Sequence, residues 1–205
     1  MTSLSLTYRS PNNCVISLAA PLKGMVKIQN VVAVADLHQP LDLEAILRVF
    51  PAAKYRPEEF PGLVYYLKKP RTTLLLFTSG KMVCAGAKST RSATAAITRV
   101  IVELQRNGIV IMSSPEIQIT NIVSTNDFSA SIDLEAAAER LSKTIYEPEQ
   151  FPGLIYRMDD PKTVFLLFAT GKLVCTGAKK EADVYAANEK LRLALEANHL
   201  IAPLM

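Results

Sequence analysis

The sequence repeats itself once, and this repeat limits the fold more than any other feature. Residues 60–88, FPGLVYYLKKPRTTLLLFTSGKMVCAGAK, return at residues 151–179 as FPGLIYRMDDPKTVFLLFATGKLVCTGAK. Each residue maps onto a counterpart 91 positions later without insertion or deletion, and about 40% of positions match over a window of about 80 residues. Two copies of this length indicate a duplicated domain with pseudo-twofold symmetry, because solenoid arrays need more and shorter units.

Each copy has the same order of expected elements. Residues 27–35 are rich in β-branched side chains, which predicts a strand. Residues 41–50 have apolar side chains at helical spacing, and Pro51 ends this helix. The other elements expected in the first copy are strands at about 63–68, 72–78 and 81–87 and a helix at 89–107 stopped by Gly108. The second copy repeats this order, with helices near 132–142 and 181–197. The unit is therefore strand, helix, three-strand meander, helix.

The meander has two apolar faces, and its helices can cover only one of them. In strand 81–87, Val83 and Ala85 point to one face, while Met82, Cys84 and Gly86 point to the other. Either the two copies stack sheet on sheet and bury the second face, or they join edge to edge and leave it exposed as a binding surface. From the residues alone, stacking is favoured.

The hairpin turns predict an aromatic pair at one end of each copy. Antiparallel strands that turn at residues 68–69 and 159–160 place residues on either side of the turn opposite one another. The pairs that result are Phe60 with Phe77 and Phe151 with Phe168, and a proline follows the first ring of each pair. Phenylalanines in apolar strands are also typical of a core, so the pairing alone leaves their role open.

The composition is that of a globular protein, with 49% apolar and 20% charged residues and no apolar run near the roughly 18 residues of a membrane span. Three cysteines without a CxxC motif argue against a disulfide framework or a zinc site, and Cys84 and Cys175 are expected in the core, in a reducing compartment. His38 and His199 occupy unmatched positions, and no catalytic or metal-ligand pattern repeats. We therefore expect no enzyme activity, cofactor, metal, membrane contact or small-molecule substrate.

Charge is divided unevenly between the copies. Residues 27–108 carry 12 Lys and Arg against 6 Asp and Glu, a net +6, whereas residues 118–200 carry 9 against 12, a net −3. This asymmetry indicates either different partners at the two ends or drift of solvated surface charge. We expect three segments: a flexible extension at 1–24, without the basic region of a signal peptide, and repeats at 25–113 and 114–205.

Several blocks together resemble the TATA-box-binding protein family, over about Lys27–Leu200. The most specific are FPGLIYRMDDPK, YEPEQFPG, the LLLFTSGKMVCAGAK and LLFATGKLVCTGAK pair, and IQNVV matched by ITNIV. EPEQFPGL is closer to archaeal than to eukaryotic members, while the extra N-terminal segment and the missing acidic tail depart from the pattern. The resemblance implies an α+β saddle: one continuous antiparallel sheet, helices on its convex face, and an apolar underside that sits on a widened DNA minor groove.

The resemblance also implies roles for particular residues. Phe60, Phe77, Phe151 and Phe168 match rings that wedge into base steps, and Asn30 and Asn121 match amides that bond minor-groove acceptors near the dyad. Without the resemblance, an asparagine in a strand is most often a satisfied edge residue. The matched groove contacts are Val32, Val123, Val83, Val174, Leu75, Leu166, Ala85, Thr176, Pro61 and Pro152. An apolar floor favours A·T pairs, because the amine of guanine would lose its hydrogen-bond partner there.

Basic positions and departures complete the implied site. The matched phosphate contacts are Lys81, Lys172, Lys88, Lys179 and Arg157. Two positions of the first copy differ from their equivalents in the second. Tyr66 is the equivalent of Arg157, and Ala85 is the equivalent of Thr176, so we expect one hydroxyl contact to be missing.

The resemblance implies partners as well. The loop with Glu147, Glu149 and Gln150 resembles the one that holds transcription factor B, and its carboxylates suit a basic partner, although acidic loops are commonly only solvated. We expect a general transcription initiation factor that binds TATA-box promoter DNA, kinks it by phenylalanine intercalation and nucleates assembly with factor B and, indirectly, RNA polymerase. The expected location is the archaeal nucleoid, or the nucleus of a eukaryote. The alternatives are a paralogue with altered or lost TATA preference that acts as a protein-interaction platform, and a nucleic-acid hydrolase that borrows the fold.

Overall fold

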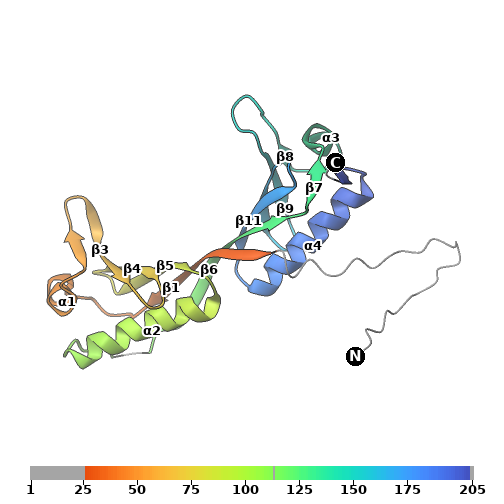
Figure 1. Cartoon of the computed structure of the whole chain (residues 1–205). Helices are drawn as coiled ribbons and strands as arrows, with labels where there is room; N and C mark the ends of the chain where they lie inside the picture. The colour runs from red at the N-terminus through yellow and green to blue at the C-terminus, as the bar shows by residue number, and fades with distance from the viewer. Residues whose placement is uncertain (1–25, 113, 204–205) are drawn as a thin grey trace, which may run out of the picture.

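The computed structural model describes residues 26–112 and 114–203, and both copies share one succession of elements, to which the second copy adds two short strands (Figure 1). The first copy contributes β1 (Lys27–Asp36), α1 (Leu43–Val49), β2 (Lys54–Arg56), β3 (Phe60–Leu67), β4 (Thr72–Phe77), β5 (Lys81–Ala87) and α2 (Thr90–Arg106). The second contributes β6 (Ile117–Asp127), β7 (Ala130–Ile132), α3 (Leu134–Arg140), β8 (Thr144–Ile145), β9 (Leu154–Met158), β10 (Thr163–Leu167), β11 (Lys172–Ala178), α4 (Glu181–Ala197) and β12 (Ile201–Pro203). The predicted order of strand, helix, meander and helix is confirmed, while the short strands β2, β7, β8 and β12 were not predicted. The expected extension at 1–24 lies outside the described residues.

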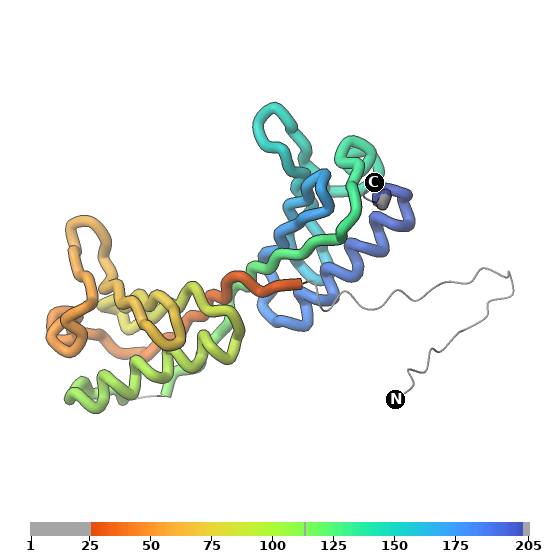
Figure 2. The backbone as a smooth tube through the Cα atoms, viewed as in Figure 1, coloured from red at the N-terminus to blue at the C-terminus, as the bar shows by residue number. Residues whose placement is uncertain are grey.

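The two copies join edge to edge in one ten-stranded antiparallel sheet. Its strand order is β2-β3-β4-β5-β1-β6-β11-β10-β9-β8, so β1 and β6 pair at the centre and the copies are related by a pseudo-twofold axis between them. Figure 2 shows the two halves as similar lobes on either side of this central pair. Stacking of two sheets, the arrangement that the residues alone favoured, is therefore wrong, because each copy pairs its edge strand with the other.

Side-chain caps mark the start of α1 and of α2, and a glycine follows the end of α2. Asp42 accepts hydrogen bonds from the N–H groups of the first turn of α1, and Ser89 and Ser92 form a capping box at the start of α2. After Arg106, Gly108 adopts φ +83°, a conformation that favours glycine and that confirms the predicted stop. Helices α2 and α4 lie on the same side of the sheet (Figure 1).

The helices bury one face of the sheet and leave the other uncovered. In β4, Leu74 and Leu76 are fully buried, whereas Leu75 and Phe77 point to the opposite face and are only partly buried. The buried side chains form one core cluster in each copy. Cys84 and Cys175 belong to these cores, as predicted, and burial raises the pKa of the Cys175 thiol to about 12.

Two details of the predicted strand register are wrong. Leu67 pairs with Thr72, so the turn between β3 and β4 holds four residues and Gly62, rather than Phe60, lies opposite Phe77. The second hairpin is offset in the same way, because Leu167 pairs with Leu154 and this pairing sets Gly153 rather than Phe151 opposite Phe168.

The third difference is a bulge at the end of β5, where Gly86 was predicted to share a face with Met82 and Cys84. Gly86 is instead exposed with φ +90°, and Ala87 takes the buried position. The same bulge recurs in β11, where Gly177 has φ +98°. A strict alternation of faces fails here because a bulge inserts one extra residue into its strand.

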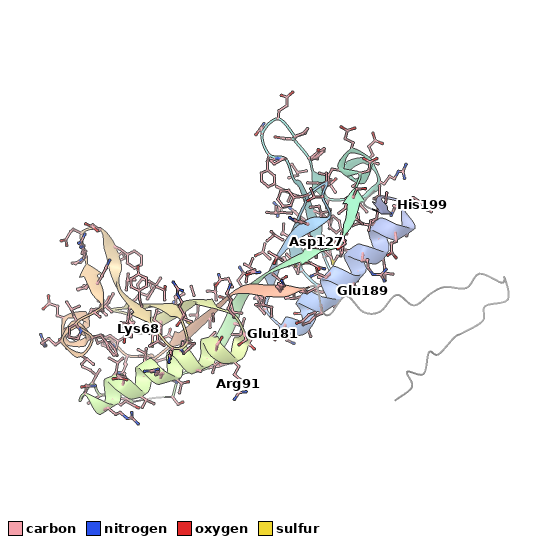
Figure 3. All side chains as sticks on the ribbon, in the orientation of Figure 1. Lys68, Arg91, Asp127, Glu181, Glu189 and His199 are labelled. Carbon is pink, nitrogen blue, oxygen red and sulfur yellow. The ribbon has the colours of Figure 1, made fainter. Side chains whose placement is uncertain are left out.

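The copies also meet where their long helices begin. Glu181, the first residue of α4, accepts hydrogen bonds from both the backbone N–H and the hydroxyl of Thr90, the first residue of α2, each at 2.9 Å. A carboxylate at a helix N-terminus is favourable, because it meets unpaired N–H groups and the positive end of the helix dipole. Figure 3 shows Glu181 at the junction of the two halves, near the central strands.

The second core contains a buried polar pair that the first core lacks. Asn126 donates to Asn188 Oδ1 at 3.1 Å, and Asn188 in turn donates to the carbonyl one turn earlier in α4 at 2.8 Å. Their counterparts in the first copy are Ala35 and Ile97, and both are buried. The two amides therefore satisfy one another in a site that the first copy fills with hydrocarbon.

This difference between the cores gives a stability prediction. Asn188→Ala should lower the free energy of unfolding by about 1–3 kcal/mol, because it leaves the buried Asn126 amide without its partner. The double variant Asn126→Ala, Asn188→Ile copies the first core and should recover most of that loss. Chemical denaturation measures both, and a double variant less stable than the single one would contradict the account.

Candidate nucleic-acid interface

We call the face of the sheet opposite the helices the concave face; the loops at the two ends project on this side (Figure 1). The strand alternation places the predicted floor residues on it together, and all of them are partly buried. They are Asn30, Val32, Leu75, Val83, Ala85, Asn121, Val123, Leu166, Val174 and Thr176. The face is thus a continuous, largely apolar surface that no other part of the described chain covers.

Six further partly buried residues share this face and were missed from the sequence. They follow from the same alternation along each strand, and they are Val34, Val64, Thr73, Thr125, Ile155 and Val164. Strand periodicity could have found them, because each lies two positions from a predicted floor residue or directly across from one. Their side chains are aliphatic or carry one hydroxyl, so the additions leave the face predominantly apolar.

An aromatic pair lies at each end of the concave face. The Phe60 and Phe77 ring centroids are 5.8 Å apart and those of Phe151 and Phe168 are 5.9 Å apart, both with an interplanar angle of 65°. This edge-to-face geometry is favourable for aromatic rings. The first ring of each pair is still more than a third exposed, 37% for Phe60 and 38% for Phe151. The predicted contact between the rings is confirmed, although the strand register behind it differs.

A glycine next to each pair explains how the rings come together. A Cβ atom on Gly62 would lie 2.7 Å from Phe60 Cε1 and 2.9 Å from Phe77 Cε1, closer than real Cβ atoms approach. Gly153 is equally confined, with its two rings at 2.7 and 3.1 Å. The repeated FPGL motif therefore supplies a ring, an exposed proline (Pro61 and Pro152) and the space that the second ring needs.

Two asparagines lie beside the pseudo-twofold axis, and the backbone fixes their amides. Asn30 Oδ1 accepts from the Gly86 N–H at 2.7 Å, and Asn121 Oδ1 accepts from the Gly177 N–H at 2.8 Å. Both glycine N–H groups point this way because of the bulges described above. Only the amide oxygen can accept a hydrogen bond from an N–H group, so the NH₂ group of each amide supplies the donors for a ligand, and of its two N–H bonds Asn121 can direct one to the Thr176 hydroxyl.

The two amides differ in one neighbour. The Thr176 hydroxyl lies 3.2 Å from both Oδ1 and Nδ2 of Asn121. At the equivalent place beside Asn30, Ala85 has no hydroxyl to offer. The Thr176 hydroxyl is thus hydrogen-bonded within the protein. Because Ala85 has no hydroxyl, Asn30 lacks this internal contact.

Basic side chains border the concave face. Lys81, Lys172, Lys88, Lys179 and Arg157 are all exposed, and Lys88 Nζ donates to the backbone oxygen of Gln29 at 2.8 Å. The counterpart of Arg157 is Tyr66, which is 56% exposed. Exposed cations around an apolar face suit a polyanion whose charges flank a less polar surface.

The loop before β9 is an exposed turn that leads directly into one aromatic pair. Glu147, Glu149 and Gln150 are exposed, and the Glu147 carbonyl accepts from the N–H groups of Gln150 and Phe151, each at 2.9 Å. Figure 2 shows this loop projecting from the second lobe. The turn fixes where Phe151 leaves the loop while the carboxylates stay accessible.

Within residues 26–112 and 114–203, no cluster of three or more His, Cys, Asp or Glu could hold a metal ion. No described helix combines the length and the apolar character that crossing a membrane requires.

The family described as "Transcription factor TFIID (or TATA-binding protein, TBP)" matches residues 25–107 and 116–197. The chain belongs to the TATA-binding protein family. A TATA-box-binding protein of Pyrodictium occultum is 48% identical over 181 residues, which cover 88% of this chain and 91% of that protein. The TATA-box-binding protein of Pyrococcus furiosus is 43% identical over 179 residues, covering 87% and 94%. Among solved structures, Methanococcus jannaschii TBP superposes with a TM-score of 0.77 at 44% identity, covering 84% of this chain and 99% of that one.

These comparisons confirm the resemblance inferred from the sequence and its archaeal character. The family consists of transcription factors and not of enzymes, so the chain acts through binding.

Proposed function

We propose that this chain is a general transcription initiation factor that binds the minor groove of TATA-box promoter DNA with its concave face and bends it. The observation that carries the proposal is an uncovered apolar face with a partly exposed aromatic pair at each end. Minor-groove proteins insert apolar side chains between base steps and kink the duplex, and a ring pair held at each rim has the shape for this.

The centre of the face would read A·T pairs. In the minor groove both A·T and T·A present acceptors, which match the NH₂ groups that Asn30 and Asn121 keep available. A guanine would place its exocyclic amine against Val32, Val123 and their neighbours, where it would find no acceptor. The discrimination therefore comes from two donors and from the hydrocarbon around them.

The edges of the concave face would contact the DNA backbone, and its two ends would stabilise the kinks in the DNA. The lysines beside the face and Arg157 are placed for phosphates, which fix register without reading sequence. Unstacking a base step costs a few kcal/mol, which is offset by the protein surface that the bent DNA contacts. Because each ring already packs against its partner, it has few rotamers in the free protein, so its insertion into DNA costs less conformational entropy.

Partners would follow from the exposed loop of the second copy. Glu147, Glu149 and Gln150 would contact transcription factor B, and RNA polymerase would join through that factor. The carboxylates and the net −3 of the second copy favour a basic partner surface. We place this assembly in the nucleoid of an archaeal cell, on the basis of the archaeal relatives, with repeats at residues 25–113 and 114–205.

A second candidate function is a paralogue that keeps the fold but has lost its TATA preference and serves as an interaction platform. It is favoured by the two departures of the first copy, Ala85 and Tyr66, which remove a hydroxyl and a cation from that half. Both departures lie in one copy, so they would weaken that half more than the other.

The decisive experiment compares a TATA duplex with one in which central A·T pairs are replaced by G·C. We expect each replacement to cost about 1–3 kcal/mol of binding free energy. Titration by gel shift or anisotropy, at several salt concentrations, separates this sequence preference from phosphate binding. Equal affinities at every salt concentration would favour the interaction platform instead.

Removal of one wedge should uncouple bending from stability. Phe168→Ala should reduce the bend angle of a TATA duplex, measured by fluorescence energy transfer between its ends, with little change in Tm, because the ring lies on the uncovered face. The matched control is Phe165→Ala in the same hairpin, whose ring is fully buried and whose loss should cost about 3–5 kcal/mol of stability. A large loss of Tm in Phe168→Ala with unchanged bending would refute the assignment.

The central amide gives a prediction about hydrogen-bond polarity. Asn121→Asp keeps an oxygen for the Gly177 N–H but replaces the donor by a charged acceptor, so we expect at least about tenfold weaker TATA binding, on the order of 1.4 kcal/mol or more. Gln105→Glu, an exposed change of the same charge on helix α2, is the control. Similar losses in both variants would mean that net charge, rather than the lost donor, is responsible.

A further inference from the structure

The outer end of the concave face in the first copy carries a lysine on an aromatic ring. Lys54 of β2 pairs directly with Val64 of β3, and Tyr66 lies two residues further along β3. Directly paired residues point to the same face of a sheet, and Val64 and Tyr66 belong to the concave face, so Lys54 points there too. Its Nζ atom lies 5.9 Å from the centroid of the Tyr66 ring, within reach of a cation–π interaction.

The second copy has the same geometry with the two side-chain types exchanged. Ile145 of β8 pairs with Ile155 of β9, and Arg157 lies two residues further along β9. These residues are 91 positions after those of the first copy. The cation therefore sits on the inner strand, β9, in the second copy and on the outermost strand, β2, in the first. The apolar partner, 47% exposed for Ile145 and 56% for Tyr66, moves the opposite way.

Lys54 keeps its charge available in this position. It takes part in none of the ion pairs found among residues 26–112 and 114–203, and the carboxylate of Glu59, five residues later in the sequence, is bound by Arg56 at 3.1 Å. A ring face attracts an ammonium group through its quadrupole without neutralising it, so the N–H donors stay free for an anion. Tyr66 also borders a hollow that is lined by Lys68, Arg71 and Lys88, so basic side chains gather around this ring.

We propose that Lys54, supported by the Tyr66 ring, is the DNA-backbone contact of the first copy, in place of the arginine that the second copy has at Arg157. This inference rests on the proposed DNA-binding function. Because β2 is one strand further out than β3, the contact moves outward by roughly one strand spacing, about 4.8 Å. An ammonium is a point charge on a flexible stem, whereas a guanidinium binds two phosphate oxygens at once, so the two ends grip the backbone differently.

The experiment measures how TATA-duplex affinity depends on salt in four variants. The slope of log K against log salt is negative, and each phosphate contact that is lost lowers its magnitude by about 0.9. We expect this decrease for Lys54→Gln and for Arg157→Gln, and the wild-type slope for Tyr66→Phe, which keeps the ring but loses the hydroxyl. The control is Arg91→Gln, which removes the same charge from the start of helix α2, on the helix side of the sheet (Figure 3).

A rescue variant and a footprint locate the contact. Tyr66→Arg in the Lys54→Gln background introduces on β3 the cation that the second copy has at Arg157, and it should return the wild-type slope. Ethylation interference should lose one phosphate in Lys54→Gln, and only at the end of the site bound by the first copy. Melting temperatures should be unchanged, because Lys54 and Tyr66 are exposed.

The outcomes separate this inference from the function on which it rests. If Arg157→Gln lowers the slope and Lys54→Gln behaves like Arg91→Gln, then the Lys54 contact is refuted and the DNA-binding function stands. If Tyr66→Phe weakens TATA-duplex binding at every salt concentration while Lys54→Gln behaves like Arg91→Gln, then the tyrosine hydroxyl is the contact instead. A wild-type chain that fails to bind the TATA duplex would overturn both proposals.

Discussion

The antiparallel pairing of β1 with β6 decides the rest of the architecture. A free sheet edge exposes a row of unpaired N–H and C=O groups, and here each copy satisfies the central edge of the other. Because the two copies form a single continuous sheet, they cannot also pack against each other face to face, and both long helices, α2 and α4, lie on one side of it. The second face stays uncovered because the inner edges are paired, and its apolar side chains become a surface for a ligand.

Duplication gives the molecule near-symmetric ends, while a duplex site that must be read in one direction needs the ends to differ. The differences between the copies are therefore as informative as the matches. The first copy has a net charge of +6 and the second of −3, and Thr176 of the second copy has a hydroxyl that its equivalent, Ala85, lacks. Lys54 and Tyr66 of the first copy are replaced by Ile145 and Arg157 in the second. Orientation on DNA can come only from such differences, because the matched rings and amides are indifferent to a half-turn about the axis.

Local patterns predicted much of this fold and long-range contacts defined the rest. Periodicity, the end at Pro51 and the stop at Gly108 predicted the helices, and turn residues predicted the meander, because those signals lie within a few residues of one another. The sequence did not show that the two central strands pair, since an edge does not reveal what completes it. The four-residue turn after Leu67 and the bulge at Gly86 were also missed from the sequence. Each of them shifts the strand register, and the alternation of apolar residues along a strand does not reveal such a shift.

The bulge also explains why sequence reasoning could find the asparagines but not what they do. A strand without the extra residue would keep the Gly86 N–H in the ladder, and the Asn30 amide could then turn either its oxygen or its nitrogen outward. Because the glycine adopts φ +90°, its N–H points to Asn30 Oδ1 and fixes the amide with its donors outward. The polarity of the centre of the concave face is therefore set by a backbone conformation in β5, and the same device recurs at Gly177 for Asn121.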